Sequence, residues 1–139
     1  NTLLHAACEE GYLRIVSLLE TNPRNAGINL NAPNRNGNTP LHLAFLNERF
    51  RLVKWLVSHE RVDVNLQNND GNTLLHLASE KGDLEIVKLL SNQDGINLTK
   101  PNNHQNYPLH LASQNGHINI VRWLLTQESV KAELGDADN

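Results

Sequence analysis

One six-residue pattern recurs four times along the chain and constrains the fold more than any other feature of the sequence. Each copy is an apolar hexad around a histidine, and the copies begin at Thr2, Thr39, Thr73 and Tyr107. The four histidines are separated by 37, 34 and 34 residues. An aliphatic residue between the copies returns every 34 residues, at Ile28, Val62, Ile96 and Val130. Such a period is typical of stacked repeats, in which one unit is too small to bury its own apolar face.

Each repeat contains two short stretches with the apolar spacing of a helix. The first starts at the hexad, where Pro40 and Pro108 lack only an amide that a helix start leaves unused, and Thr39 and Thr73 are placed as N-caps. A glycine follows in three of the four repeats. The second stretches cover residues 13–19, 50–56, 84–90 and 118–124. The sequence therefore predicts two helices in every repeat.

The segments between the helix pairs are predicted to form hairpin-like fingers. Asn36-Gly37 and Asp70-Gly71 suit tight turns with positive φ. The last finger has His104-Gln105 at this place and Tyr107 where the other repeats have threonine. We expect that finger to be either strained or selected for contact.

Two further positions depart from the pattern. Glu48 replaces the glycine between the two helices of the second repeat, and we expect the preceding Asn47 to supply the left-handed turn instead. The first interval has three extra residues within 21–27, which predicts a longer loop after the second helix.

The repeats resemble ankyrin repeats, whose pattern combines a turn, Thr-Pro-Leu-His-x-Ala and a second helix with Ile-Val-x-x-Leu-Leu. The resemblance implies an all-α solenoid of stacked helix-turn-helix units joined by hairpin-like fingers. We expect one domain over residues 1–139, with full repeats at 28–61, 62–95 and 96–129, a partial repeat at 1–27 and the start of a further repeat at 130–139. We also expect the array to continue at one or both ends in a longer protein.

Composition argues against several functional classes. A net charge of −3 without a basic run argues against nucleic-acid partners. Apolar runs of about five residues are far shorter than the ~20 that span a bilayer, so no membrane insertion is expected. A single cysteine excludes an internal disulfide framework and fits a reducing compartment. We expect a monomeric cytoplasmic protein, located in the host cytosol if the chain comes from a secreted effector.

The residues that invite a catalytic or metal-binding reading favour a structural one. Pattern histidines in successive layers are roughly 10 Å apart and cannot share a metal. The resemblance implies that each imidazole bonds the preceding threonine or the neighbouring finger backbone. Cys8 is expected to be a small packed residue, and the remaining histidines, His59, His104 and His117, to lie at the surface. We therefore predict no enzyme activity, no cofactor and no metal.

Two features leave alternatives open. Trp55 and Trp123 occupy the same place in two second helices, either partly buried or as exposed contact residues. An asparagine stands three residues before the helix-starting leucine in every repeat, at Asn1, Asn38, Asn72 and Asn106. These amides form a ladder that pairs either with itself or with the backbone of an extended peptide.

The resemblance places partner binding on the finger tips and on the solvent face of the first helices. The finger positions are Arg35, Asn36, Asn38, Asn69, Asp70, Asn72, Asn103, His104 and Asn106. The helix positions are Glu9, Glu10, Leu46, Asn47, Glu80, Lys81, Gln114 and Asn115. The predicted function is a non-catalytic protein-protein interaction module. The alternative is a substrate-recruiting or structural arm of a larger multidomain enzyme, such as a secreted effector of an intracellular bacterium.

Overall fold

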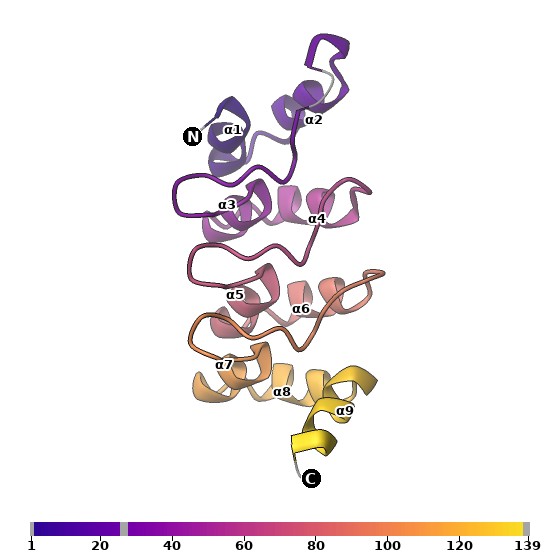
Figure 1. Cartoon of the computed structure of the whole chain (residues 1–139). Helices are drawn as coiled ribbons and strands as arrows, with labels where there is room; N and C mark the ends of the chain where they lie inside the picture. The colour runs from indigo at the N-terminus through magenta and orange to yellow at the C-terminus, as the bar shows by residue number, and fades with distance from the viewer. Residues whose placement is uncertain (1, 26–27, 138–139) are drawn as a thin grey trace. The chain divides into compact units, whose positions relative to one another are not determined.

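The computed structural model describes residues 2–25 and 28–137, and the regular structure within these ranges is entirely helical (Figure 1). Four helical hairpins follow one another: α1 (Leu3–Glu10) with α2 (Leu13–Thr21), α3 (Pro40–Leu46) with α4 (Phe50–Ser58), α5 (Leu74–Lys81) with α6 (Leu84–Ser91), and α7 (Pro108–Gln114) with α8 (Ile118–Leu125). A 3-10 turn, η1 (Pro23–Asn25), lies in the longer first loop, and α9 (Glu128–Ala137) follows the last hairpin. The predicted all-α repeat architecture is confirmed.

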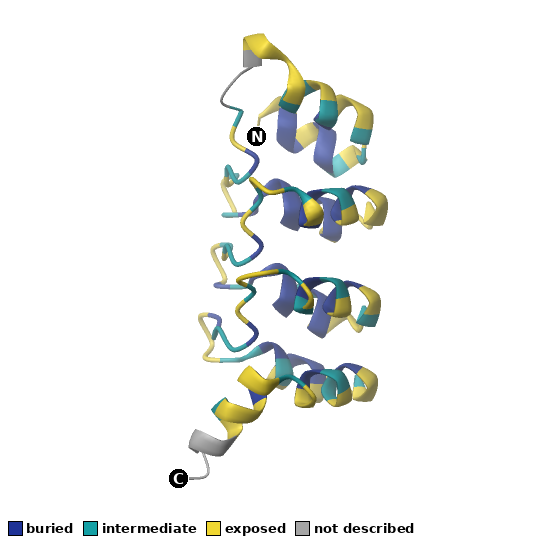
Figure 2. Cartoon of the chain, turned by 90° about the vertical axis from the view of Figure 1, so that its right-hand side faces the viewer, coloured by how far each residue is buried: buried dark blue, intermediate teal, exposed yellow. Residues whose placement is uncertain are grey.

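The chain divides into two compact units, residues 1–69 and residues 70–139. In the first unit α1 packs on α3, and in the second α5 packs on α7 while α6 contacts α8. In most helices the buried residues lie on one side and the exposed residues on the other (Figure 2). Leu52 and Leu56 of α4, like Ile86 and Leu90 of α6, expose at most 1% of their surface. Each such side chain contributes about 1.5–3 kcal/mol of burial free energy, which a single hairpin cannot obtain alone.

Reciprocal hydrogen bonds between a threonine and a histidine begin the first three hairpins. The Thr39 hydroxyl accepts from the backbone N–H of His42 at 3.4 Å, and the Thr39 backbone N–H donates to Nδ1 of His42 at 3.2 Å. Thr2 and Thr73 form the same pair with their histidines. The predicted threonine N-caps are confirmed, and this pairing satisfies two amides that a helix start would otherwise leave free.

The second ring nitrogen of a pattern histidine reaches the next finger in each unit. His5 Nε2 lies 2.6 Å from the carbonyl oxygen of Ala32, and His76 Nε2 lies 3.1 Å from that of Asn106. Since Nδ1 accepts from a threonine amide, Nε2 carries the proton and donates. The predicted structural role of these histidines is confirmed. His110 differs, because it is exposed and stacks on Tyr107 with ring centroids 5.1 Å apart.

The turn between α3 and α4 corrects one expectation. Glu48 itself takes the left-handed conformation with φ 61°, while Asn47 has φ −97°. Glu48 stands where the other repeats have Gly11, Gly82 and Gly116, all with positive φ, so the left-handed conformation belongs to this place in the repeat. Asn47 instead closes the end of α3, donating from Nδ2 to the Leu43 carbonyl at 2.8 Å. Asn115 and Gly116 repeat this arrangement after α7. The left-handed conformation costs Glu48 about 1–2 kcal/mol that glycine avoids.

Helix α9 also differs from the sequence-based expectation. Val130 continues the aliphatic series that begins each extended finger, yet Glu128–Ala137 is helical. Residues 131–134 are strong helix formers, whereas the earlier fingers have asparagine, aspartate or β-branched residues at many of these places. Val130 is 3% exposed and Tyr107 donates its hydroxyl to Glu133 at 3.1 Å. The last two residues of the predicted further repeat, 138 and 139, lie outside the described part of the chain.

Candidate binding surface

Each of two fingers, one in each unit, is closed by an asparagine side chain that imitates a backbone turn. Oδ1 of Asn34 accepts from the backbone N–H groups of Asn36 and Asn38 at 2.9 and 3.0 Å. Oδ1 of Asn102 accepts from those of His104 and Asn106 at the same distances. Such a side chain fixes a short loop without help from a strand ladder. These finger tips are therefore held in place before any partner arrives.

Asparagines at the base of a finger also connect it to the finger before. In the first unit Nδ2 of Asn68 donates to Oδ1 of Asn38 at 3.0 Å, and the backbone N–H of Asn69 donates to the Asn36 carbonyl at 3.0 Å. In the second unit Nδ2 of Asn102 donates to Oδ1 of Asn72 at 2.9 Å.

These contacts show how the predicted asparagine ladder is used. Oδ1 of Asn38 and Oδ1 of Asn72 each accept from an asparagine at the base of the following finger, so both acceptors serve the framework. Asn38 is only 9% exposed, and Asn72 and Asn106 are half-buried. The side chain of Asn38 therefore serves the framework of the fingers. Asn1 of the ladder lies outside the described residues.

Two glycines allow the fingers to approach this closely. Gly37 has φ 74°, and a Cβ atom there would lie 2.6 Å from the backbone nitrogen of Asn69. Gly71 has φ 78°, and its Cβ would lie 2.5 Å from the backbone nitrogen of Asn103. In the last finger Gln105 adopts φ 63° at the corresponding turn. The backbone of the last finger is therefore strained at Gln105, which agrees with the first of the two alternatives expected for this finger, strain or selection for contact.

Most of the predicted binding residues are exposed. In the first unit the exposed positions are Glu10, Arg35, Asn36, Leu46, Asn47 and Asn69. In the second unit they are Asp70, Glu80, Lys81, Asn103, His104, Gln114 and Asn115. Asn47 and Asn115 also close the ends of their helices through Nδ2. Apart from Asn47 and Asn115, the exposed side chains of this face carry mainly amide, carboxylate, ammonium and imidazole groups, which suit a polar interface.

A hollow of about 410 Å³ lies on this face of the first unit, between the end of α1, the finger and α3. Its lining residues are Glu9, Asn34, Arg35, Asn36, Asn38 and Leu43. This single depression is thus bordered by one carboxylate, one guanidinium, several amides and one apolar side chain. The hollow is suited to polar groups of a partner and offers no pair of converging acids for catalysis.

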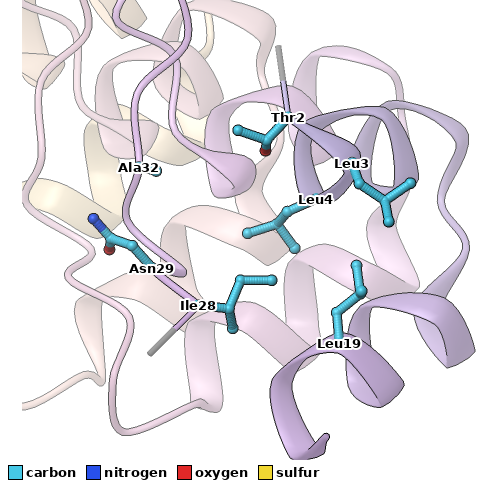
Figure 3. Close-up of a pocket in the computed structure, with 7 residues that line it drawn as sticks. All are labelled: Thr2, Leu3, Leu4, Leu19, Ile28, Asn29 and Ala32. Atoms are coloured by element: carbon cyan, nitrogen blue, oxygen red, sulfur yellow. The ribbon is translucent and has the colours of Figure 1, made fainter. Parts of the chain in front are cut away.

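A second hollow, of about 480 Å³, lies between α1, α2 and residues 28–32, and it is apolar (Figure 3). Leu4, Leu19 and Ile28 converge there, and the Thr2 hydroxyl is held 3.0 Å from Nδ1 of His5. One repeat further on, the residue equivalent to Leu19 is Leu56, which is fully buried. This hollow therefore belongs to the face on which successive layers pack, and its lining contains no titratable side chain.

The two tryptophans are partly buried rather than protruding. Trp123 donates from Nε1 to the Ser91 hydroxyl at 3.1 Å, and the Lys88 ammonium lies 5.0 Å from the centroid of its ring. The ring of Trp55 lies 5.0 Å from that of His59. Both indoles thus rest against neighbouring side chains, which favours the packing alternative.

Reactive groups in the described part of the chain are held in structural roles. Cys8 is fully buried, and burial, followed by the charge of Glu9, raises the pKa of its thiol to about 12. It therefore stays protonated at neutral pH, as expected for a packed residue. No group of three or more potential metal ligands occurs among the described residues. His59 and His117 are half-buried, and His117 Nε2 lies 2.8 Å from the Glu80 carbonyl.

None of the helices in the described ranges is long and apolar enough to cross a lipid bilayer. The sequence matches the protein family described as ankyrin repeats (3 copies) over residues 1–68 and 47–136, which together cover most of the chain. No curated protein matches the chain significantly. The family match, the helical hairpins and the glycine-dependent fingers agree, and the chain therefore belongs to the ankyrin repeat family.

Proposed function

We propose that the chain binds a partner protein or peptide through its finger tips and the exposed ends of its first helices, without chemistry of its own. Ankyrin repeats are generally protein-protein interaction modules and typically non-catalytic. The observation that carries the proposal is that different side chains of a finger have different roles. Buried or half-buried asparagines hold the backbone, while neighbouring polar side chains such as Arg35 and His104 are exposed to solvent.

Preorganisation supports this use of the surface. A loop that is already closed by Asn34 or Asn102 loses little conformational freedom when it binds, so more of the contact energy appears as affinity. The exposed groups are mainly amides with charges of both signs, which favours a polar interface with bridging water. A standard interface takes about 800 Å² from each partner.

The experiment compares two sets of substitutions on one identified partner. The full chain is used to capture a partner, which is identified by mass spectrometry, purified and titrated by calorimetry. One variant removes contacts from the proposed face in the second unit, with Glu80→Ala, His104→Ala and Gln114→Ala. The control variant alters the second helices instead, with Glu85→Ala, Asn119→Ala and Arg122→Ala.

We expect the first variant to weaken binding at least about thirtyfold, as the loss of interface hot spots does, and the control to stay within about twofold. Unchanged far-UV circular dichroism of both variants checks that the helices are intact. A stronger effect of the control set than of the finger set would reject the proposed face.

A further inference from the structure

A separate hollow lies at the opposite end of the first helix from the helix start. It has a volume of about 400 Å³ and is lined by Gly11, Tyr12, Leu13, Arg14, Ile15 and Arg51. Helix α1 has 8 residues, so this turn is about 12 Å along the helix from its first residue. None of its lining residues belongs to a finger or to the predicted binding positions. The hollow is therefore distinct from the finger face.

Two arginines of the hollow take no part in holding the fold. Arg14 and Arg51 are the second residues of α2 and α4, and both are exposed. Neither forms a hydrogen bond or ion pair within the described ranges of the chain. Two other arginines of this unit are engaged: Nε of Arg49 donates to the Glu9 carbonyl at 2.9 Å, and Nη2 of Arg61 donates to the Ile28 carbonyl at 3.1 Å.

The repeat itself does not require arginine at these places. In the third and fourth repeats the positions equivalent to Arg14 and Arg51 are occupied by Glu85 and Asn119. The two guanidinium groups are thus a property of the first unit alone. Their charge is not balanced within the hollow, because no carboxylate is among its lining residues.

Apolar surface borders the two cations. Tyr12 is 52% exposed and Ile15 is 41% exposed, although both line a concave surface. An exposed aromatic ring next to free guanidinium groups is a frequent composition of protein interfaces. The lining therefore complements a ligand that has both carboxylates and an apolar side chain.

We propose that this hollow is a docking site for an acidic peptide segment of a partner protein. Two carboxylates of the segment engage Arg14 and Arg51, and an apolar side chain of the segment contacts Tyr12 and Ile15. A guanidinium group pairs with a carboxylate through two parallel hydrogen bonds. Arg14 and Arg51 line the same hollow, and alternate side chains of an extended peptide lie about 7 Å apart on one face. Carboxylates at alternate positions of a peptide therefore reach both arginines.

The probe is the fluorescein-labelled peptide Gly-Glu-Ser-Glu-Ser-Phe-Gly-amide, which places two carboxylates and one ring on the same face when it is extended. The matched peptide has glutamine in place of both glutamates. Binding to the full chain is followed by fluorescence anisotropy, and the contact residues are identified from amide shifts in ¹⁵N spectra. A short labelled oligothymidylate tests whether the hollow prefers a nucleic-acid backbone.

We expect the glutamate peptide to bind at least about tenfold more tightly than the glutamine peptide and to shift the amides of residues 11–15 and 51. Arg14→Gln and Arg51→Gln should each weaken binding about tenfold, the usual effect of losing a charge-assisted hydrogen bond. Arg122→Gln, at an exposed arginine of α8, should leave the affinity unchanged. Well-dispersed ¹⁵N spectra identify the variants that remain folded.

Three results of the affinity measurements would overturn the proposal. They are equal affinity for the two peptides, equal weakening by Arg122→Gln, and tighter binding of the oligothymidylate than of the peptide. Amide shifts confined to the fingers would reject the hollow as the binding place without bearing on the proposed function of the finger face.

Discussion

The side chain of Asn102 donates to Oδ1 of Asn72 at 2.9 Å while its own Oδ1 accepts two backbone amides of its finger. One residue therefore performs two tasks in the second unit. It closes its own finger, and it joins that finger to the one before. Because Asn102 is only 6% exposed, water cannot readily replace these bonds.

Removal of this side chain should destabilise the second unit. Asn102→Ala loses three hydrogen bonds and leaves amides without partners, so we expect a loss of about 2–4 kcal/mol in the free energy of unfolding. Asn102→Asp keeps the acceptor oxygen for both backbone amides, but the Asn72 amide has to turn so that its Nδ2, and not its Oδ1, faces the new carboxylate oxygen. With that turn we expect a smaller loss than for Asn102→Ala. Urea denaturation of both variants measures the difference, with exposed Asn119→Ala as the control. Equal losses for Asn102→Ala and Asn102→Asp would contradict the double role.

The close approach of two fingers gives a prediction for a matched pair of glycines. Gly71→Ala must adopt φ 78° and also bring a methyl group to 2.5 Å from the backbone nitrogen of Asn103. Gly116→Ala must adopt φ 72°, but nothing lies within 4 Å of the added atom. We expect Gly116→Ala to cost about 1–2 kcal/mol from the left-handed conformation alone, and Gly71→Ala to cost more. Thermal and urea denaturation compare the two, and a larger loss for Gly116→Ala would refute the steric argument.

The sequence predicts the helices well because their signals are local. The hexad begins each first helix, Thr39 and Thr73 act as N-caps, and apolar spacing marks the second helices. The base asparagines of the fingers could also have been found. Asn34, Asn68 and Asn102 recur every 34 residues, four positions before the ladder asparagines. This spacing is typical of a side chain that closes a short turn.

Other features depend on what surrounds a residue, and the sequence does not encode them locally. His110 occupies the same place in its hexad as His76, yet one is exposed and the other is fully buried. Asn47 has the better intrinsic tolerance of positive φ, but the left-handed conformation falls on Glu48, at the place that glycine occupies in the other repeats. At Val130 the repeat period and the local helix propensity disagree, and the helix prevails.

An unpartnered hydroxyl in α5 provides a third prediction. Ser79 is fully buried, and its Oγ has no hydrogen-bond partner among the described residues. Ser79→Ala removes a desolvated polar group with little change of volume, so it should leave the free energy of unfolding unchanged or raise it by about 1 kcal/mol. The control is Ser113→Ala at the equivalent position of α7, where the hydroxyl donates to the Leu109 carbonyl at 2.8 Å and is exposed. A clear destabilisation by Ser79→Ala in urea denaturation would show that the hydroxyl stabilises the fold, contrary to what its burial without a partner indicates.

The buried imidazole of His76 makes the stability of the second unit depend on pH. Burial lowers the pKa of His76 below its usual 6.5, and the nearby Lys100 charge acts in the same direction, while the carbonyls of Asn106 and Lys100 oppose it. The unfolded chain therefore binds a proton at about pH 6.5 that the folded chain does not yet bind. The free energy of unfolding contributed by His76 is complete above pH 6.5 and decreases as the pH falls toward the folded pKa, by at most about 1.4 kcal/mol per pH unit.

Urea denaturation between about pH 7.5 and 5 measures this slope for the wild type, for His76→Gln and for the control His104→Gln, whose histidine is exposed. The slope should become shallower in His76→Gln and stay at its wild-type value in His104→Gln, and an unchanged slope in His76→Gln would assign the pH dependence to another group.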